Sequence, residues 1–129
     1  MGGTALVTGA SSGIGRAFCE VLAEHGYDLL LVARRKPMLE DVASDASRHG
    51  VGAEIHEVDL SDEAQLASVS EMLGRRSIDV FINNAGVGDF RRFVDTEWEV
   101  DRRMIALNVV GFTRLLHVVA RGMAARGTG

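Results

Sequence analysis

Three glycines, Gly9, Gly13 and Gly15, lie between a short apolar run and a segment of helical period, and this order constrains the fold more than any other feature. Glycine lets the backbone turn tightly and approach another group where a Cβ would collide. The first amide groups of a helix are unpaired and carry the positive end of its dipole. A glycine-rich turn alone would also fit a turn without a ligand, but its place between strand and helix predicts a phosphate-bearing nucleotide, with Ser11 and Ser12 as hydroxyl donors.

Four short apolar runs alternate with longer segments of helical period, which is the pattern of a parallel sheet covered by helices. The predicted strands are residues 4–8, 28–33, 53–58 and 78–82. The first predicted helix carries an apolar stripe at residues 14, 17, 18, 21 and 22 and ends at Gly26. The second runs from Pro37 to Gly50, and the third from Ser61 as N-cap to Gly74. We therefore expect one α/β domain spanning residues 1–129.

The polarity of the strands predicts their order in the sheet. Right-handed crossovers leading outward from the first strand give the order 3-2-1-4. The strand around Ile55 is the most polar, as an edge strand should be, whereas residues 28–33 are almost wholly apolar, as in a strand buried on both faces. Both observations favour a doubly wound parallel sheet.

A long helix is predicted after the fourth strand, opened by a capping box at Thr96 and Glu99 and continuing to about Arg126. Between Met104 and Val119 it is apolar almost all the way round. One side can cover the sheet, and the other needs a second cover. That cover is either a second subunit, which makes a homo-oligomer through residues 97–126, or further chain beyond the 129 residues.

Composition excludes several classes of function. The net charge is −4 and the paired arginines are separated by acidic or apolar residues, so nucleic acid is not an expected partner. The sequence has no run of about 18 apolar residues, and no membrane partner is expected. The single Cys19 fits a small buried side chain in a reducing compartment, so we expect a soluble cytoplasmic protein. The four histidines have no metal-ligand spacing, and no metal is expected.

The spacing G-x-x-x-G-x-G of residues 9–15, followed by Asn83-Asn84-Ala85-Gly86 after the fourth strand, resembles the short-chain dehydrogenase/reductase family from Thr4 to Gly129. The resemblance implies a Rossmann-type fold, a nicotinamide coenzyme and hydride transfer between that coenzyme and a small-molecule ketone or secondary alcohol, with the substrate itself left open. It implies that the coenzyme phosphates and ribose lie against Gly9, Ser11, Ser12, Gly13, Ile14 and Gly15. It also implies that Asp59 and Leu60 lie against the adenine, and that Asn83, Ala85 and Gly86 support the bound coenzyme.

The end of the second strand distinguishes the two nicotinamide coenzymes. A carboxylate there would accept hydrogen bonds from the adenosine ribose, whereas an arginine would pair with a 2′-phosphate. The sequence has Arg34, Arg35 and Lys36 at this place and no carboxylate. A guanidinium matches the geometry of a phosphate, so NADP(H) is expected rather than NAD(H), with Arg34 as the first choice of phosphate ligand and Arg35 as the second. A solvated basic turn before Pro37 explains Arg35 or Lys36 equally well.

The family resemblance also identifies what is missing from the 129 residues. Of the catalytic groups it implies, only Asn108 is present, where it would help to hold a water that connects the catalytic lysine to solvent; a packing amide paired with a nearby carbonyl is the alternative. The resemblance also implies a catalytic serine after the next strand and a Tyr-x-x-x-Lys pair beyond it. Neither is present: the only tyrosine is Tyr27, the only lysine is Lys36, and no serine follows Ser77. We therefore expect an amino-terminal, coenzyme-binding part, incomplete relative to a full family domain and inactive alone. A binding module without catalysis and a truncated fragment without function are the alternatives.

Overall fold

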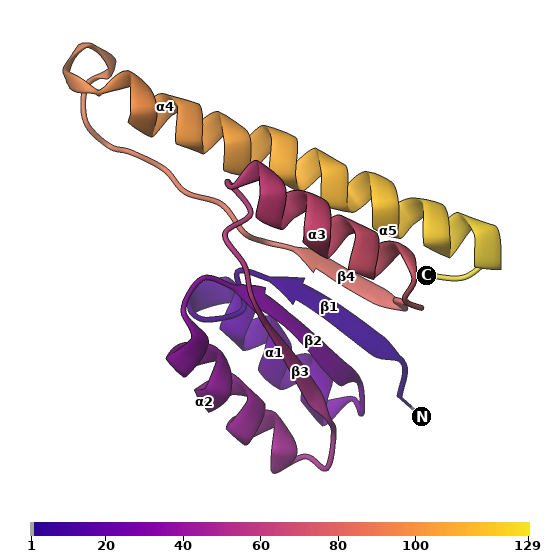
Figure 1. Ribbon diagram of the computed structural model, residues 1–129. Helices are drawn as coiled ribbons and strands as arrows, with labels where there is room; N and C mark the ends of the chain where they lie inside the picture. Colours follow the sequence, from indigo (N-terminus) through magenta and orange to yellow (C-terminus); the bar gives the residue numbers. More distant parts are fainter. Residues whose placement is uncertain (1) are drawn as a thin grey trace.

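Four parallel strands form one sheet in the order β3-β2-β1-β4 in the computed structural model, which describes residues 2–129 (Figure 1). The strands are β1 (Thr4–Thr8), β2 (Asp28–Ala33), β3 (Ala53–Glu57) and β4 (Val80–Asn83). Helices cover both faces of the sheet. The predicted strand order and the Rossmann-type doubly wound fold are confirmed.

Alternation along the central strands builds two cores, one on each face of the sheet. In β2, Leu29 and Leu31 pack with helices α1 (Gly13–Glu24) and α2 (Lys36–Ser47). Leu30 and Val32 point the other way and pack with α3 (Glu63–Gly74) and α5 (Phe112–Arg126). All four side chains are buried, whereas β3 is half-exposed along its length. The prediction of a doubly buried second strand beside a polar edge strand is confirmed.

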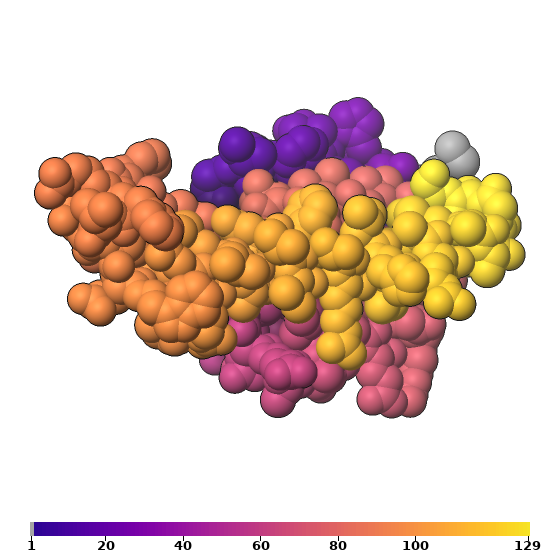
Figure 2. All heavy atoms as spheres, turned by 90° about the horizontal axis from the view of Figure 1, so that it is seen from above, coloured from indigo at the N-terminus to yellow at the C-terminus, as the bar shows by residue number. Residues whose placement is uncertain are grey.

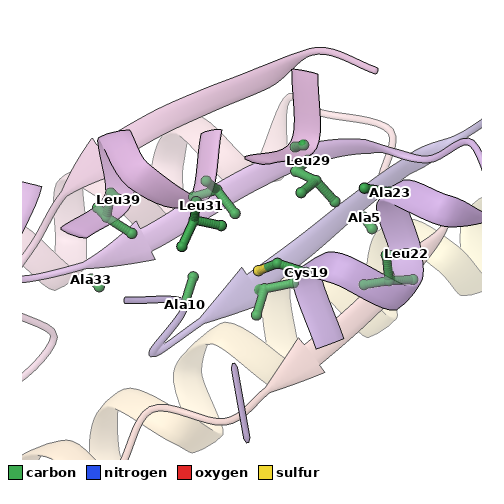
Figure 3. Packing of buried hydrophobic residues seen from close by; sticks show 12 residues of the cluster. Ala5, Ala10, Cys19, Leu22, Ala23, Leu29, Leu31, Ala33 and Leu39 are labelled. Atoms are coloured by element: carbon green, nitrogen blue, oxygen red, sulfur yellow. The ribbon is translucent and has the colours of Figure 1, made fainter. Parts of the chain in front are cut away.

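The predicted apolar stripe of helix α1 is wrong except at Leu22, because the helix buries Gly15, Cys19, Leu22 and Ala23 against the sheet. Figure 3 shows Cys19, Leu22 and Ala23 of α1 within the buried cluster. The stripe residues Ile14 and Phe18 are instead 69% and 42% exposed. Gly15, Cys19 and Ala23 are small and let the helix lie close to the strands, with Leu22 as the one large side chain on the buried face. Cys19 is buried as predicted, and burial raises the pKa of its thiol to about 12.

Two predicted helix caps are wrong. The N-cap of α3 is Asp62, whose carboxylate accepts a hydrogen bond from the Gln65 amide at 2.9 Å, and Ser61 lies before it. The Thr96 hydroxyl donates to the Arg92 carbonyl at 3.2 Å and ends the short helix η1 (Phe93–Asp95). The predicted capping box is therefore not formed. Helix α4 (Trp98–Ile105) begins after Glu97, whose side chain makes no capping hydrogen bond.

The long helix has three parts, α4, the π-helical segment η2 (Ala106–Gly111) and α5. One side packs on the sheet layer through Leu107, Leu115 and Val119. Six large apolar residues of the long helix are exposed: Trp98, Ile105, Val109, Val110, Phe112 and Leu116. Figure 2 shows α4, η2 and α5 running across one face of the molecule with no chain over them. By length and composition, Trp98–Arg126 is also apolar enough to cross a membrane, with 22% of its most apolar window buried.

Candidate nucleotide-binding site

A pocket of about 280 Å³ lies at the carboxyl ends of the four strands. The connection from β1 leads to β2 on one side, while β4 lies on the other side of β1, and an open α/β sheet binds ligands at such a switch point. The pocket is lined by Gly9, Ser11, Ser12, Ile14, Val32, Ala33, Arg34, Arg35, Val58, Asp59, Leu60, Asn84, Ala85, Gly86, Val87 and Leu107.

Most of the predicted coenzyme-binding residues meet in this pocket. Those on its wall are Gly9, Ser11, Ser12, Ile14, Arg34, Arg35, Asp59, Leu60, Ala85 and Gly86. Gly13, Gly15, Asn83 and Asn108 were also predicted for the site but are not part of the wall. Gly15, Asn83 and Asn108 act on the shape of the pocket through the contacts described below, and Gly13 begins the helix that follows the turn.

The glycine-rich turn brings helix α1 close to the end of β1. Gly13 begins the helix with a φ of 56°, a left-handed conformation that glycine adopts without steric cost. At Gly15, an added Cβ would lie 2.2 Å from the Gly9 carbonyl oxygen. Ser12 is the N-cap residue of α1, yet its hydroxyl makes no capping hydrogen bond. The first-turn amides of α1 are therefore available to an anion in the turn.

The ends of β1 and β4 are fastened together by a buried hydroxyl. Thr8 is fully buried, and its Oγ1 accepts hydrogen bonds from the Asn84 and Ala85 amides, both at 3.0 Å. The Asn84 side chain donates to the carbonyls of Thr8 and Gly9 at 3.3 and 3.4 Å. Sequence reasoning missed Thr8, although a buried hydroxyl next to a glycine-rich turn needs partners and could have been identified on that ground.

The two asparagines of the motif after β4 have separate tasks. Asn84 lines the pocket, whereas the Asn83 side chain donates to the Phe112 carbonyl at 3.0 Å. Asn83 therefore joins the end of β4 to the start of α5. Asn83 supports the site from outside the pocket, whereas Asn84 contacts the pocket directly.

Arginines from the end of β2 reach the glycine-rich turn. Arg35 donates to the hydroxyls of Ser12 and Ser11 at 3.0 and 3.3 Å. Arg34 also lines the pocket, and its charge acts on the Asp59 carboxylate. The Arg35 guanidinium thus lies beside two hydroxyl groups, an arrangement that suits the binding of a phosphate monoester.

Asp59 is held at both carboxylate oxygens. Its Oδ1 accepts from the Ser61 hydroxyl at 2.6 Å and amide at 3.0 Å, and its Oδ2 accepts from Arg103 at 2.8 Å. Partial burial acts to raise the pKa of Asp59, but the Ser61 hydrogen bonds, with the charges of Arg103 and Arg34, outweigh it and lower the pKa below its ordinary value. The pocket therefore contains an ionised carboxylate.

Asn108 in η2 pairs with a nearby carbonyl, as the packing alternative for this residue predicted. Its amide donates to the Val87 carbonyl at 2.7 Å, and its Oδ1 accepts from the Val87 amide at 2.9 Å. Although Asn108 lies in an apolar segment, it is exposed. The two hydrogen bonds fix the loop after β4, which carries Ala85, Gly86 and Val87 of the pocket.

Tyr27 and Lys36 lie away from the pocket wall. Tyr27 immediately precedes β2, at the end of the strand opposite the pocket, and a strand of this length spans about 20 Å. Lys36 is the first residue of α2.

Comparison with known proteins agrees with the geometry. A family model described as short chain dehydrogenase matches residues 3–129. The chain is 35% identical to a very-long-chain 3-oxoacyl-CoA reductase from Laccaria bicolor, covering 99% of this chain and 39% of that protein.

Two solved structures are similar over 98% of the chain, each with a TM-score of 0.94. One is a bulky-bulky ketone specific alcohol dehydrogenase from Comamonas testosteroni, 38% identical, of which the chain covers 51%. The other is a short-chain dehydrogenase from Sphingobium yanoikuyae in complex with NADPH, 41% identical, of which it covers 50%. The chain thus spans about half the length, or less, of these three proteins.

Proposed function

The chain belongs to the short-chain dehydrogenase family, and we propose that it is the coenzyme-binding part of an NADP(H)-dependent oxidoreductase. The whole protein would transfer hydride between NADP(H) and a small-molecule ketone or secondary alcohol. The relatives from Sphingobium yanoikuyae, in complex with NADPH, and Comamonas testosteroni, a ketone-specific alcohol dehydrogenase, support this proposal.

The observation that carries the choice of coenzyme is the position of Arg35 on the Ser11 and Ser12 hydroxyls. A 2′-phosphate on the adenosine ribose carries about two negative charges, and Arg34 and Arg35 both line the pocket where it would lie. The end of β2 offers no carboxylate for an unmodified ribose. These contacts favour NADP(H) over NAD(H), with the phosphate held by one or both arginines.

The remaining site residues take the roles that the family resemblance implies. We propose that the turn from Gly9 to Gly15 binds the coenzyme phosphates and ribose, that Asp59 and Leu60 bind the adenine, and that Asn83, Ala85 and Gly86 support the bound coenzyme. No hydride transfer is expected from the 129 residues alone, because Tyr27 and Lys36 lie away from the pocket.

Asn108 has capacity for the catalytic role proposed for it. Its amide retains a second hydrogen and its Oδ1 a second lone pair beyond the two hydrogen bonds to Val87. Since the residue is exposed, these sites can hold a water molecule. In the whole protein, that water would connect a catalytic lysine with solvent.

Calorimetric titration of the chain with NADPH and NADH tests the choice of coenzyme. We expect NADPH to bind at least about tenfold more tightly, a difference of about 1.4 kcal/mol. Arg35→Ala and Arg34→Ala are expected to reduce this ratio, whereas Lys36→Ala, which removes a neighbouring cation outside the pocket wall, leaves it unchanged. Equal affinities would refute the NADP(H) preference, and the absence of binding by both would refute the coenzyme site.

We also propose that the protein is a soluble, cytoplasmic homo-oligomer that associates through residues 97–126. The row of exposed apolar residues on that helix supports association, and the unpaired thiol of Cys19 fits a reducing compartment. Packing on the sheet layer accounts for the apolar inner side of the helix, and association of subunits would cover its apolar outer side without a membrane.

A further inference from the structure

We propose that Arg103 of α4 is a positioning residue for the adenine end of the pocket, because it orients the Asp59 carboxylate. This inference rests on the proposed function. Arg103 donates to Asp59 Oδ2 at 2.8 Å across 44 residues of sequence. Their side chains are 43% and 28% exposed, so the pair is partly shielded from water at the rim of the pocket.

The surroundings of Asp59 leave its side chain one orientation. The Gln65 side chain accepts a hydrogen bond from the Asp59 amide at 2.9 Å, which fixes the backbone. Ser61 donates twice to Oδ1, and Arg103 alone supplies the hydrogen bond to Oδ2. Three of the roughly four lone-pair sites of the carboxylate are thus occupied, and the one left on Oδ2 has a direction fixed by the Arg103 hydrogen bond. That lone pair is the acceptor that an exocyclic amino group of a purine needs.

Arg103 belongs to a helical face that packs against the same loop in three successive turns. Leu107 lies four residues later and lines the pocket. Gly111 lies a further four residues along, where an added Cβ would be 2.8 Å from the Leu60 carbonyl oxygen. Because Leu107 and Gly111 keep the helix against the loop, loss of the Arg103 guanidinium is expected to free the Asp59 side chain without unfolding the wall.

Loss of Arg103 would also change the balance of charge. Asp59 now lies between the Arg103 guanidinium, in direct contact, and the charge of Arg34. Without Arg103, the carboxylate is expected to turn towards Arg34, a candidate ligand of the 2′-phosphate. Arg103 thus keeps Asp59 directed to the base and leaves Arg34 for the phosphate.

Base discrimination tests this role, because a merely structural contribution would not change it. NADPH and its hypoxanthine analogue differ at the 6-position, an amino donor in one and a carbonyl oxygen in the other. A carboxylate aimed at that position is expected to favour adenine by about tenfold or more in the unmodified chain. Arg103→Met is expected to lower the ratio of dissociation constants to about threefold or less.

The matched control is Arg102→Met, since Arg102 is the neighbouring arginine of α4 and pairs with Glu99 on its own helix. This control is expected to keep the discrimination of the unmodified chain. Arg103→Lys is expected to give an intermediate ratio, because an ammonium can donate to Oδ2 without the planar geometry of a guanidinium. Should Arg103→Met fail to fold, Arg103→Lys decides: a reduced ratio supports the inference and an unchanged ratio overturns it.

The outcomes separate this inference from the proposed function. Unchanged discrimination in Arg103→Met, with NADPH still bound, overturns the role of Arg103 and leaves the coenzyme site in place. Absence of NADPH binding to the unmodified chain overturns both. Reduced discrimination in Arg103→Met and not in Arg102→Met supports the inference.

Discussion

Gly15 contributes to the site by lacking a side chain. A Cβ there would lie 2.2 Å from the Gly9 carbonyl oxygen and 2.7 Å from Asn84 Nδ2. Since the first of these atoms is backbone, Gly15→Ala is expected to push α1 away from the turn. We predict a loss of about 1 to 3 kcal/mol in the free energy of unfolding, measured by urea denaturation, and at least about tenfold weaker NADPH binding.

Gly88→Ala is the matched control for this substitution. No atom outside the neighbouring residues lies within 4 Å of the position of its Cβ, and its φ is not in the left-handed region. Its stability is expected to change by about 0.5 kcal/mol or less. Equal losses in the two variants would show that close packing at Gly15 is not the cause.

Asp59 is expected to make stability depend on pH in a predictable direction. Burial opposes its ionisation, but hydrogen bonds from Ser61 and the charges of Arg103 and Arg34 leave the pKa lowered in the folded chain. The ionised carboxylate therefore stabilises the fold above its unfolded pKa of about 3.9, and that contribution is lost as the pH falls through the folded pKa.

Asp59→Asn removes this contribution. The difference in unfolding free energy between the unmodified chain and Asp59→Asn is predicted to be about 1 kcal/mol or less at pH 7, because the group is partly exposed, and to shrink below pH 4. Urea denaturation at a series of pH values measures it. A difference that stays constant down to pH 2 would contradict the role of the charge.

At the scale of residues, most of the residues that line the pocket could be predicted from the sequence, but the side-chain pairs between distant segments could not. Gly9, Arg35 and Asp59 follow three different strands, and parallel strands bring their carboxyl ends to one edge of the sheet, so their meeting was predictable. The contact of Arg103 with Asp59 depends on the rotation of a helix 44 residues away. Nothing in the local pattern fixes that rotation.

Helices and strands were predictable from hydrophobic periodicity. The exact helix starts were not, because two neighbouring residues can each serve as the N-cap. Ser61 and Asp62 can each cap a helix, and the choice falls on Asp62 because Ser61 donates to Asp59. The Thr96 hydroxyl donates to the Arg92 carbonyl at the end of η1, so the N-cap of α4 is Glu97. The π-helical segment η2 could not be predicted from the sequence, because a helix that is apolar on all sides has no periodicity in which a change of helix type would be visible.

The missing cap of α4 gives a prediction at the scale of the element. Glu97 is the N-cap residue with no capping hydrogen bond, and aspartate is a better N-cap because its shorter side chain reaches the free amides. We predict that Glu97→Asp raises the free energy of unfolding by about 0.5 to 1 kcal/mol, seen as a higher melting temperature.

Asp62→Ala provides the opposite case at the start of α3, where the cap exists, and is expected to lower stability by about 1 kcal/mol. Glu97→Ala tests whether the charge alone matters at α4. If Glu97→Asp melts at the temperature of the unmodified chain or below it, the start of α4 is not limited by its cap.

The whole molecule has one sheet face covered by a helix whose outer side is uncovered. Leu115 and Val119 of α5 are buried on the sheet layer, while Val109 and Leu116 are 56% and 46% exposed on the other side (Figure 2). An amphipathic helix that covers a sheet has a polar outer side. This helix is apolar on both sides, so we expect a second surface to pack on its outer side. Strand β4 also pairs with β1 alone, which leaves its other edge open.

Substitutions on the outer side of the helix distinguish association through that side from association through the open edge of β4. Val109→Lys and Leu116→Lys place a charge in the proposed interface without touching β4, and we predict that the sedimentation coefficient falls to that of a monomer. Val94→Lys, at a residue 82% exposed outside the helix, is expected to leave association unchanged. An unmodified chain that sediments as a monomer would contradict the proposed association. If it is an oligomer and the variants remain as large, association does not use the outer side of the helix, and the open edge of β4, which keeps its unpaired backbone groups, is the remaining candidate.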